Sequence, residues 1–222
     1  IRERRDFGLR HPAMSERLPE AFFARDALVV ARALVGTRIV HDDGHTVRVA
    51  RIVETEAYRG PRDLACHPRA GLTKRTRTLF GPPGTAYVYF IYGMHECFNV
   101  VCKAQGAGHA VLVRAAEILE GSAERADGPG RFARTMGLSR AYDGASLLGD
   151  RVFLLGRGEN VRIRTTPRVG VAYAGEWADA PYRFCDACSP HVSKPPKSAI
   201  GRGVTASPKR RSRAATGLRS GR

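Results

Sequence analysis

The spacing of apolar residues predicts an amphipathic helix near the start of the chain. Leu28, Ala31 and Leu34 recur at helical spacing, which places them on one helix face. Asp26 before this run is a candidate N-cap, because its carboxylate can accept a hydrogen bond from the first turn. Gly36 after the run is a stop signal. We therefore expect a helix between Asp26 and Gly36.

A hairpin pattern follows this helix. The turn signal Asp42-Asp43-Gly44 separates an apolar run at residues 37–41 from a longer stretch that ends at Tyr58. An Asp-Gly pair between two β-prone runs is typical of a hairpin turn. We expect two antiparallel strands here, of which the second is the longer.

Short β-prone stretches dominate the remainder of the chain. Residues 59–83 predict a long loop, and the pattern turns helical after Glu117, with a short helix in residues 128–144 that ends at Gly137. The β-prone stretches are residues 87–92, 97–103, 110–115, 152–155, 161–164 and 168–173. This set predicts a single α+β domain with a curved antiparallel β-sheet and flanking helices.

The second strand of the expected hairpin carries two acids. Side chains alternate between the faces of a strand, so Glu54, Glu56 and Tyr58 are expected on one face. The opposite face is expected to receive Val53, Thr55 and Ala57. Because carboxylates are costly to desolvate, two of them beside an aromatic ring indicate pairing or function.

A second segment carries complementary chemistry. Tyr87, Tyr89 and Tyr92 recur along one stretch, and Asn99 follows. Rings can sandwich a flat ligand, an amide can recognise its edge, and a carboxylate can activate water. Together with Glu56 these residues suit chemistry on a flipped nucleobase.

Six ordered blocks of the sequence resemble one protein family. They are ETEAY at 54–58, His67, YVYFIYGM at 87–94, Asn99, VLVRAAE at 111–117 and RVGVAYAGEW at 168–177. The set is similar to the alkyladenine (3-methyladenine, methylpurine) DNA glycosylases. The resemblance covers residues 18–193 and implies one catalytic domain there. It also implies an enzyme that removes alkylated or deaminated purines from duplex DNA in base excision repair.

The resemblance assigns the walls of a base pocket. It implies that Tyr58, His67 and Tyr89 stack on the extruded purine and bind its edge. Asn99 matches the residue that disfavours normal guanine by crowding its exocyclic amine, which is selection against the wrong base.

A β-hairpin that inserts into DNA is also implied. Tyr92, directly before Gly93 and Met94, matches an aromatic residue that fills the gap left by the flipped nucleotide. Without the resemblance, Tyr92 would be interpreted as the cap of a hairpin core. His95 departs from the family, whose members often carry an aromatic residue at this position.

The resemblance gives the bond-breaking step to Glu56 and Arg114. It implies that Glu56 deprotonates or orients a water. It also implies that Arg114 helps to place this water and the Glu56 carboxylate. A carboxylate can also stabilise the oxocarbenium-like sugar that develops as a glycosidic bond opens. Glu54 has no chemical role in the family, so we expect it to pair structurally with a neighbouring arginine.

Strand cleavage is not expected. A bifunctional glycosylase needs an amine nucleophile that forms a Schiff base with the sugar. Neither Lys74 nor Lys103 belongs to a motif that matches the pocket. We therefore expect simple hydrolysis without a cofactor, which leaves an abasic site.

Positive charge is concentrated in the last part of the chain. The 222 residues carry a net charge of +16, of which residues 194–222 contribute nine Lys or Arg and no acid. This segment is rich in Pro, Gly, Ser and Arg, so we expect a disordered basic tail. It either tethers duplex DNA through its phosphates or is merely a solvated terminus. Residues 1–17 are expected to form a flexible N-terminal segment.

The sequence also limits compartment and membrane contact. No apolar run approaches the roughly 20 residues that cross a bilayer. The first residues show no secretion signal, which indicates the cytoplasm or nucleoid of a bacterium, or the nucleus of a eukaryote. We expect a monomer.

A metal site is a weaker alternative. Cys185, Cys188 and His191 have zinc-like spacing, but a fourth ligand would have to come from elsewhere, such as Cys66 or His67. Free thiols are the competing interpretation, and the resemblance implies no metal.

Two other functional classes remain open from sequence alone. A noncatalytic nucleic-acid-binding module would explain the charge and the tyrosines, but an acid such as Glu56 among the rings would repel phosphate. A hydrolase for free nucleosides would need neither an inserting hairpin nor a basic tail. The sequence does not rank 3-methyladenine, 7-methylguanine, hypoxanthine and ethenoadenine as substrates.

Overall fold

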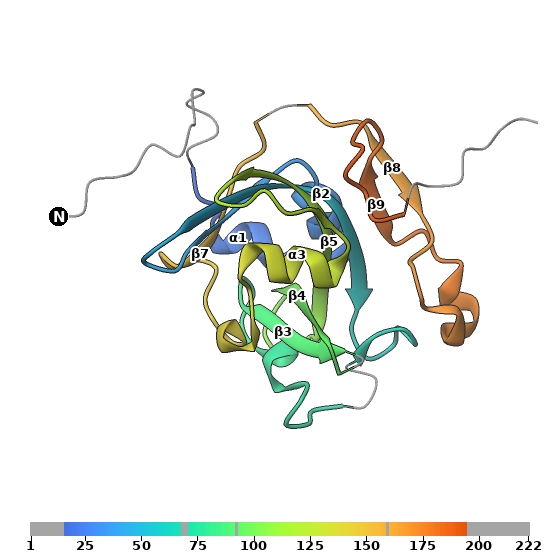
Figure 1. The fold of residues 1–222 in the computed structure, drawn as a ribbon. Helices are drawn as coiled ribbons and strands as arrows, with labels where there is room; N and C mark the ends of the chain where they lie inside the picture. Colours follow the sequence, from blue (N-terminus) through green and yellow to red (C-terminus); the bar gives the residue numbers. More distant parts are fainter. Residues whose placement is uncertain (1–15, 68–70, 92, 159, 195–222) are drawn as a thin grey trace, which may run out of the picture.

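The computed structural model describes residues 16–67, 71–91, 93–158 and 160–194 (Figure 1). The α-helices there are α1 (Glu20–Phe23), α2 (Ala27–Leu34) and α3 (Pro129–Met136). The strands are β1 (Arg38–Asp42), β2 (Val47–Arg59), β3 (Ala86–Ile91), β4 (His95–Cys102), β5 (His109–Glu120), β6 (Ala126–Asp127), β7 (Val152–Leu155), β8 (Ile163–Thr166) and β9 (Arg183–Asp186). Short 3-10 helices span Arg77–Phe80, Arg140–Tyr142 and Ala172–Ala178.

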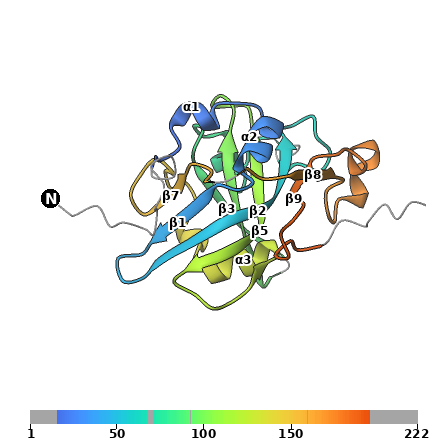
Figure 2. The ribbon, with the colours of Figure 1, turned by 90° about the horizontal axis from the view of Figure 1, so that it is seen from above.

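The strands form one curled antiparallel sheet, which confirms the predicted α+β fold (Figure 1). Its order is β3-β4-β5-β2-β1-β7, with β6 added beside β5 and the β8–β9 pair added beside β2. β2 is central because it pairs with β5 over most of its length and changes its other partner from β1 to β9. In Figure 2, α1 and α2 lie above the strands and α3 lies below them.

The predicted helix and hairpin are both present. The Asp26 carboxylate accepts a hydrogen bond from the backbone nitrogen of Leu28 at 3.0 Å, as expected of an N-cap. β1 and β2 pair across the predicted turn. Gly137 caps the end of α3, and its φ of 69° is left-handed and suits glycine. One apolar core joins α2, α3 and the sheet, with the fully buried residues Val30, Leu34, Ile52, Phe98, Phe132 and Met136 among its members.

Two β-bulges lie beside each other in β2 and β5. The pairing skips Val53 in β2 and Arg114 in β5, so each strand holds one extra residue at this level. An extra residue changes the face toward which the following side chains point. Ile52 therefore packs in the core with α2, whereas Glu54 and Glu56 meet Arg114 on the other face.

The bulge corrects one predicted position. Val53 was expected on the face opposite Glu54, but it packs with Ala115, Cys185 and Val192 instead. Thr55 follows the prediction, since its hydroxyl donates to a backbone carbonyl of α2 at 2.9 Å. The predicted common face of the two glutamates and Tyr58 is confirmed.

Two predicted elements are wrong. The residues directly after Glu117 are not helical, because β5 continues to Glu120 and Arg51 Nε binds Glu117 Oε2 at 2.8 Å across the strand pair. The short helix predicted in residues 128–144 is present as α3. Residues 168–173 do not form a strand, because the backbone nitrogen of Val169 donates to a carboxylate and Gly170 has a φ of 77°. The other predicted strands are confirmed with bounds shifted by at most two residues, except that β5 ends five residues beyond the predicted end at residue 115. None of the described helices is long and apolar enough to cross a membrane.

The burial of His109, at the start of β5, predicts that acid lowers the stability of the fold. Burial lowers the pKa of His109 to about 4 from its ordinary 6.5. The unfolded chain therefore takes up this proton first, and stability falls as the pH drops from about 6.5 towards 4. At about 1.4 kcal/mol per pKa unit, protonation of His109 lowers the free energy of unfolding by at most roughly 3 kcal/mol. Because solvent screens this group, we expect a loss of about 1–2 kcal/mol.

Urea unfolding of the native protein and of His109→Gln at pH 7.0 and pH 5.0 measures this contribution. Burial also lowers the pKa values of His41 and His67, so only the difference between the two proteins is informative. Equal pH dependence in both would contradict the assignment to His109.

Candidate active site

The described residues surround a cavity of about 670 Å³. Its walls come from β3, β4, β5, the turn before His67, the start of α3 and the segment after Val169. The predicted site residues among its lining residues are Tyr58, His67, Tyr89, Asn99 and Arg114. The fold thus brings residues from five separate sequence blocks around one space.

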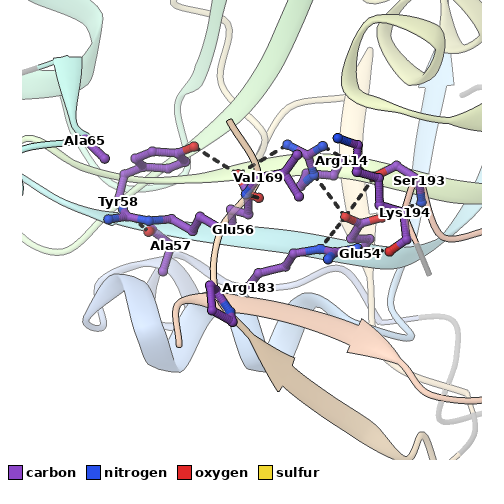
Figure 3. A network of polar contacts seen from close by, with 12 residues as sticks. Glu54, Glu56, Ala57, Tyr58, Ala65, Arg114, Val169, Arg183, Ser193 and Lys194 are labelled. Carbon is purple, nitrogen blue, oxygen red and sulfur yellow. Dashed lines mark hydrogen bonds and ion pairs between the residues drawn. The ribbon is translucent and has the colours of Figure 1, made fainter. Parts of the chain in front are cut away.

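Glu56 is fully buried, and the three residues that donate hydrogen bonds to it line the cavity (Figure 3). One carboxylate oxygen accepts hydrogen bonds from the Tyr58 hydroxyl at 2.9 Å and from Arg114 Nη1 at 3.3 Å. The other accepts from the backbone nitrogen of Val169 at 2.7 Å. Three donors from three elements therefore fix this carboxylate next to the lining residues.

Glu54 has a different environment on the same face (Figure 3). It accepts hydrogen bonds from Arg114 Nε at 2.9 Å and Arg183 Nε at 2.7 Å. It also accepts from the Ser193 nitrogen at 2.6 Å and from the Ser193 hydroxyl at 2.9 Å. The predicted structural pairing of Glu54 with an arginine is confirmed, and two arginines share it.

The charges in this network support one another. Burial opposes the charged form of Arg114, but Glu56 and Glu54 more than offset it and raise the pKa of this guanidinium. Burial, reinforced by the Glu56 carboxylate, raises the pKa of Tyr58 well above its usual 10. Tyr58 is therefore a neutral donor, and Arg114 a permanent cation.

Aromatic rings form another part of the cavity wall. The rings of His67 and Tyr89 meet edge to face with centroids 4.5 Å apart, and the Tyr87 hydroxyl lies 3.3 Å from His67 Nδ1. Burial and the nearby charge of Arg75 lower the pKa of His67, which makes it a neutral imidazole at neutral pH. A neutral imidazole can donate or accept at the edge of a base.

Asn99 is held by the backbone. Its amide nitrogen donates to the carbonyl of Tyr87 at 3.1 Å and to that of Cys97 at 3.3 Å. The side chain is buried and cannot rotate without losing both bonds. It therefore offers a rigid edge to any flat ligand in the cavity.

Comparisons with known proteins give the family of this chain. The family model described as methylpurine-DNA glycosylase (MPG) matches residues 21–190. The chain belongs to this family. The predicted DNA glycosylase activity is confirmed, so the protein is a hydrolase that acts on DNA with damaged bases.

Curated relatives of this glycosylase cover nearly the same region. A protein of Myxococcus xanthus is 54% identical over 184 residues, which are 81% of this chain and 94% of the relative. A protein of Anaeromyxobacter dehalogenans is 50% identical over 185 residues, with shares of 82% and 88%. One of Legionella pneumophila is 44% identical over 180 residues, with shares of 80% and 98%. Each is named "Putative 3-methyladenine DNA glycosylase".

Three residues that line the candidate site were missed from sequence. Val169, Ser193 and Lys194 all line the cavity. Val169 belongs to the block RVGVAYAGEW, which carried the resemblance but was interpreted as a strand. Ser193 and Lys194 give no local signal, because only the fold brings them to Glu54 and Arg183.

The tip of the predicted DNA-inserting hairpin is only partly described. β3 and β4 pair as a hairpin, and Met94 near its tip is 72% exposed. Tyr92 lies outside the described residues, so its insertion into DNA stays a prediction. His95 contributes to the cavity wall and packs close to Gly130 at the start of α3.

The cysteines of the glycosylase are all free thiols. Cys66 and Cys97 line the cavity, and Cys188 accepts a hydrogen bond from Arg162 at 3.4 Å. Among residues 16–194 as far as they are described, no three His, Cys, Asp or Glu side chains gather as metal ligands. The zinc interpretation of Cys185, Cys188 and His191 therefore gains no support.

Proposed function

We propose that this glycosylase extrudes a damaged purine from duplex DNA into the cavity and hydrolyses its N-glycosidic bond. The observation that carries the proposal is the buried Glu56 carboxylate, fixed by three donors directly behind an aromatic cavity. The cavity volume of about 670 Å³ accommodates a flipped nucleotide. Tyr58, His67 and Tyr89 would form its stacking walls.

Glu56 would act on water at the cavity edge. Its two oxygens point to the Val169 nitrogen and to Arg114, so a water that contacts these groups would also meet the carboxylate. Glu56 would take a proton from that water while its charge stabilises the electron-poor sugar. Arg114 would hold the water and the carboxylate in line.

Nucleophilic attack on the sugar by a lysine is the main alternative mechanism in the same site. Lys194 lines the cavity, although its described contact is a backbone one, in which its carbonyl accepts from Arg183. A lysine at this position could in principle attack the sugar. We propose simple hydrolysis, because the fixed carboxylate lies behind the pocket whereas Lys194 is exposed.

Single-turnover base release from duplexes with hypoxanthine or ethenoadenine tests the proposal. We expect an abasic product that breaks only after alkali and no adduct after borohydride. An adduct that forms with native protein and disappears with Lys194→Ala would contradict simple hydrolysis. Native protein that binds duplex DNA but releases no base would contradict the role of the cavity.

The basic segment 195–222 is proposed to add affinity without taking part in chemistry. It holds eight of the 37 Lys and Arg residues, and each phosphate contact adds to the salt dependence of binding. A chain that ends at Lys194 should bind duplex DNA more weakly below about 0.1 M salt, with a flatter dependence on salt. Its single-turnover rate at saturating protein should stay within about twofold of the native rate, and a large fall would contradict the proposal.

A further inference from the structure

A buried ion pair joins two loops that both contribute residues to the cavity lining. Asp63 begins the turn that leads to His67, and Arg168 directly precedes Val169. Arg168 Nη1 lies 2.6 Å from Asp63 Oδ2, and Nη2 lies 2.9 Å from Oδ1. Both side chains are fully shielded from solvent. Two parallel charge-assisted hydrogen bonds fix the relative orientation of the loops.

Arg168 is also tied to the strand that carries Glu56. Its Nη1 donates to the carbonyl of Ala57 at 3.0 Å, and its Nη2 donates to that of Trp177 at 3.2 Å. Its guanidinium carbon lies 4.8 Å from the centroid of the Tyr58 ring. Arg168 therefore makes a cation–π contact with the Tyr58 ring.

Asp63 performs the matching task in the other loop. Its carboxylate accepts from the backbone nitrogens of Arg59 and Ala65, each at 3.1 Å. The backbone nitrogen of Cys66 donates to the Asp63 carbonyl at 2.8 Å. These bonds shape the turn that delivers Ala65, Cys66 and His67 to the cavity.

Two of the three donors to Glu56 depend on this pair. Tyr58 rests on Arg168, and Val169 is its chain neighbour, while Arg114 reaches Glu56 from β5 independently. Burying two charges is expensive, and well-packed apolar residues would often serve stability as well. We infer that Asp63 and Arg168 are positioning residues, which hold Glu56, Tyr58 and His67 in the arrangement needed for base excision. This inference rests on the proposed function.

Asp63→Asn tests the inference, because it keeps the shape of the side chain but removes the charge that orients Arg168. A displacement of about 1 Å can cost about a hundredfold in rate, so we expect the single-turnover rate on hypoxanthine duplex to fall between about tenfold and a hundredfold. Binding of the same duplex should stay within about twofold, because neither side chain is exposed to DNA. The rate of each variant is measured at a temperature below the midpoint of its thermal unfolding.

Asp186→Asn is the matched control. Asp186 is nearly buried and binds Arg51 at 2.7 Å, but it does not line the cavity. The control should lose stability and keep the excision rate within about twofold. Asp63→Glu is the second variant, because it keeps the charge but moves the carboxylate by one methylene group. We expect it to lose rate as well, since the geometry rather than the charge is changed.

A double-variant comparison separates positioning from general loosening. Tyr58→Phe removes the hydrogen bond to Glu56 and keeps the ring. If Asp63 acts through Tyr58 and Glu56, the fold-loss in rate of the double variant Asp63→Asn with Tyr58→Phe should be smaller than the product of the two single losses. We expect it to be smaller by at least about threefold. For the double variant Asp186→Asn with Tyr58→Phe, the fold-loss in rate should equal the product of the two single losses.

Native rates in both Asp63 variants would overturn the inference while leaving the proposed function intact. Equal losses of rate and duplex binding, shared by Asp186→Asn, would also overturn it, because they indicate a purely structural role. Native protein without base release would instead contradict the proposed function, and the inference would then have no reaction to serve.

Discussion

Replacing Glu56 by glutamine is expected to lower single-turnover base release by about a thousandfold. Glutamine keeps the size of the side chain, and its amide oxygen can still accept from Val169. It cannot take a proton from water or stabilise a cationic sugar by charge. Because Glu56 is fully buried, duplex affinity should change little. Base release and gel-shift titration on the same hypoxanthine duplex measure the two effects separately.

Glu117→Gln serves as the control for charge removal. Glu117 pairs with Arg51 at 2.8 Å on the same sheet, outside the cavity lining. Its rate should match that of the native protein. If Glu56→Gln retained more than a tenth of the native rate, Glu56 could not be the group that activates water.

Replacing Glu54 by alanine is expected to lower the free energy of unfolding by about 3–5 kcal/mol. The change leaves Arg114 and Arg183 as buried cations without their shared carboxylate. It also removes the acceptor for the nitrogen and hydroxyl of Ser193. Urea unfolding followed by circular dichroism measures the loss.

An exposed ion pair gives the comparison for Glu54. Asp150 binds Arg17 at 2.7 Å, but its side chain is 92% exposed. Asp150→Ala should therefore change the free energy of unfolding by less than about 1 kcal/mol. A loss below about 1 kcal/mol for Glu54→Ala would show that the two arginines find other partners.

Local patterns predicted those parts of the protein that depend on neighbouring residues. The helix after Asp26 and the hairpin around Asp43 follow from capping and turn chemistry, and both are present. The common face of Glu54, Glu56 and Tyr58 follows from strand geometry. The resemblance then supplied five residues that the fold gathers around one cavity.

Long-range contacts account for what sequence could not predict. Ser193 reaches Glu54 across 139 positions, and nothing near either residue indicates the other. Residues 168–173 look β-prone, but the buried ion pair of Arg168 and the bond from Val169 to Glu56 replace strand pairing. The extra residues at Val53 and Arg114 are equally invisible, because a bulge depends on both strands at once.

Beyond the paired bulges, residue number matters more than residue identity in the middle of this sheet. Deleting Thr55 alone would turn Glu56 and Tyr58 toward the apolar core, and both residues would still be present in the sequence. Deleting Val53 would instead remove the extra residue and leave Glu54, Glu56 and Tyr58 on the face opposite Ile52. Conservative substitutions at Val53 would leave the orientation unchanged. Single-residue gaps between Glu54 and Tyr58 should therefore be far less tolerated in relatives of this chain than a gap at Val53 or exchanges of one apolar side chain for another.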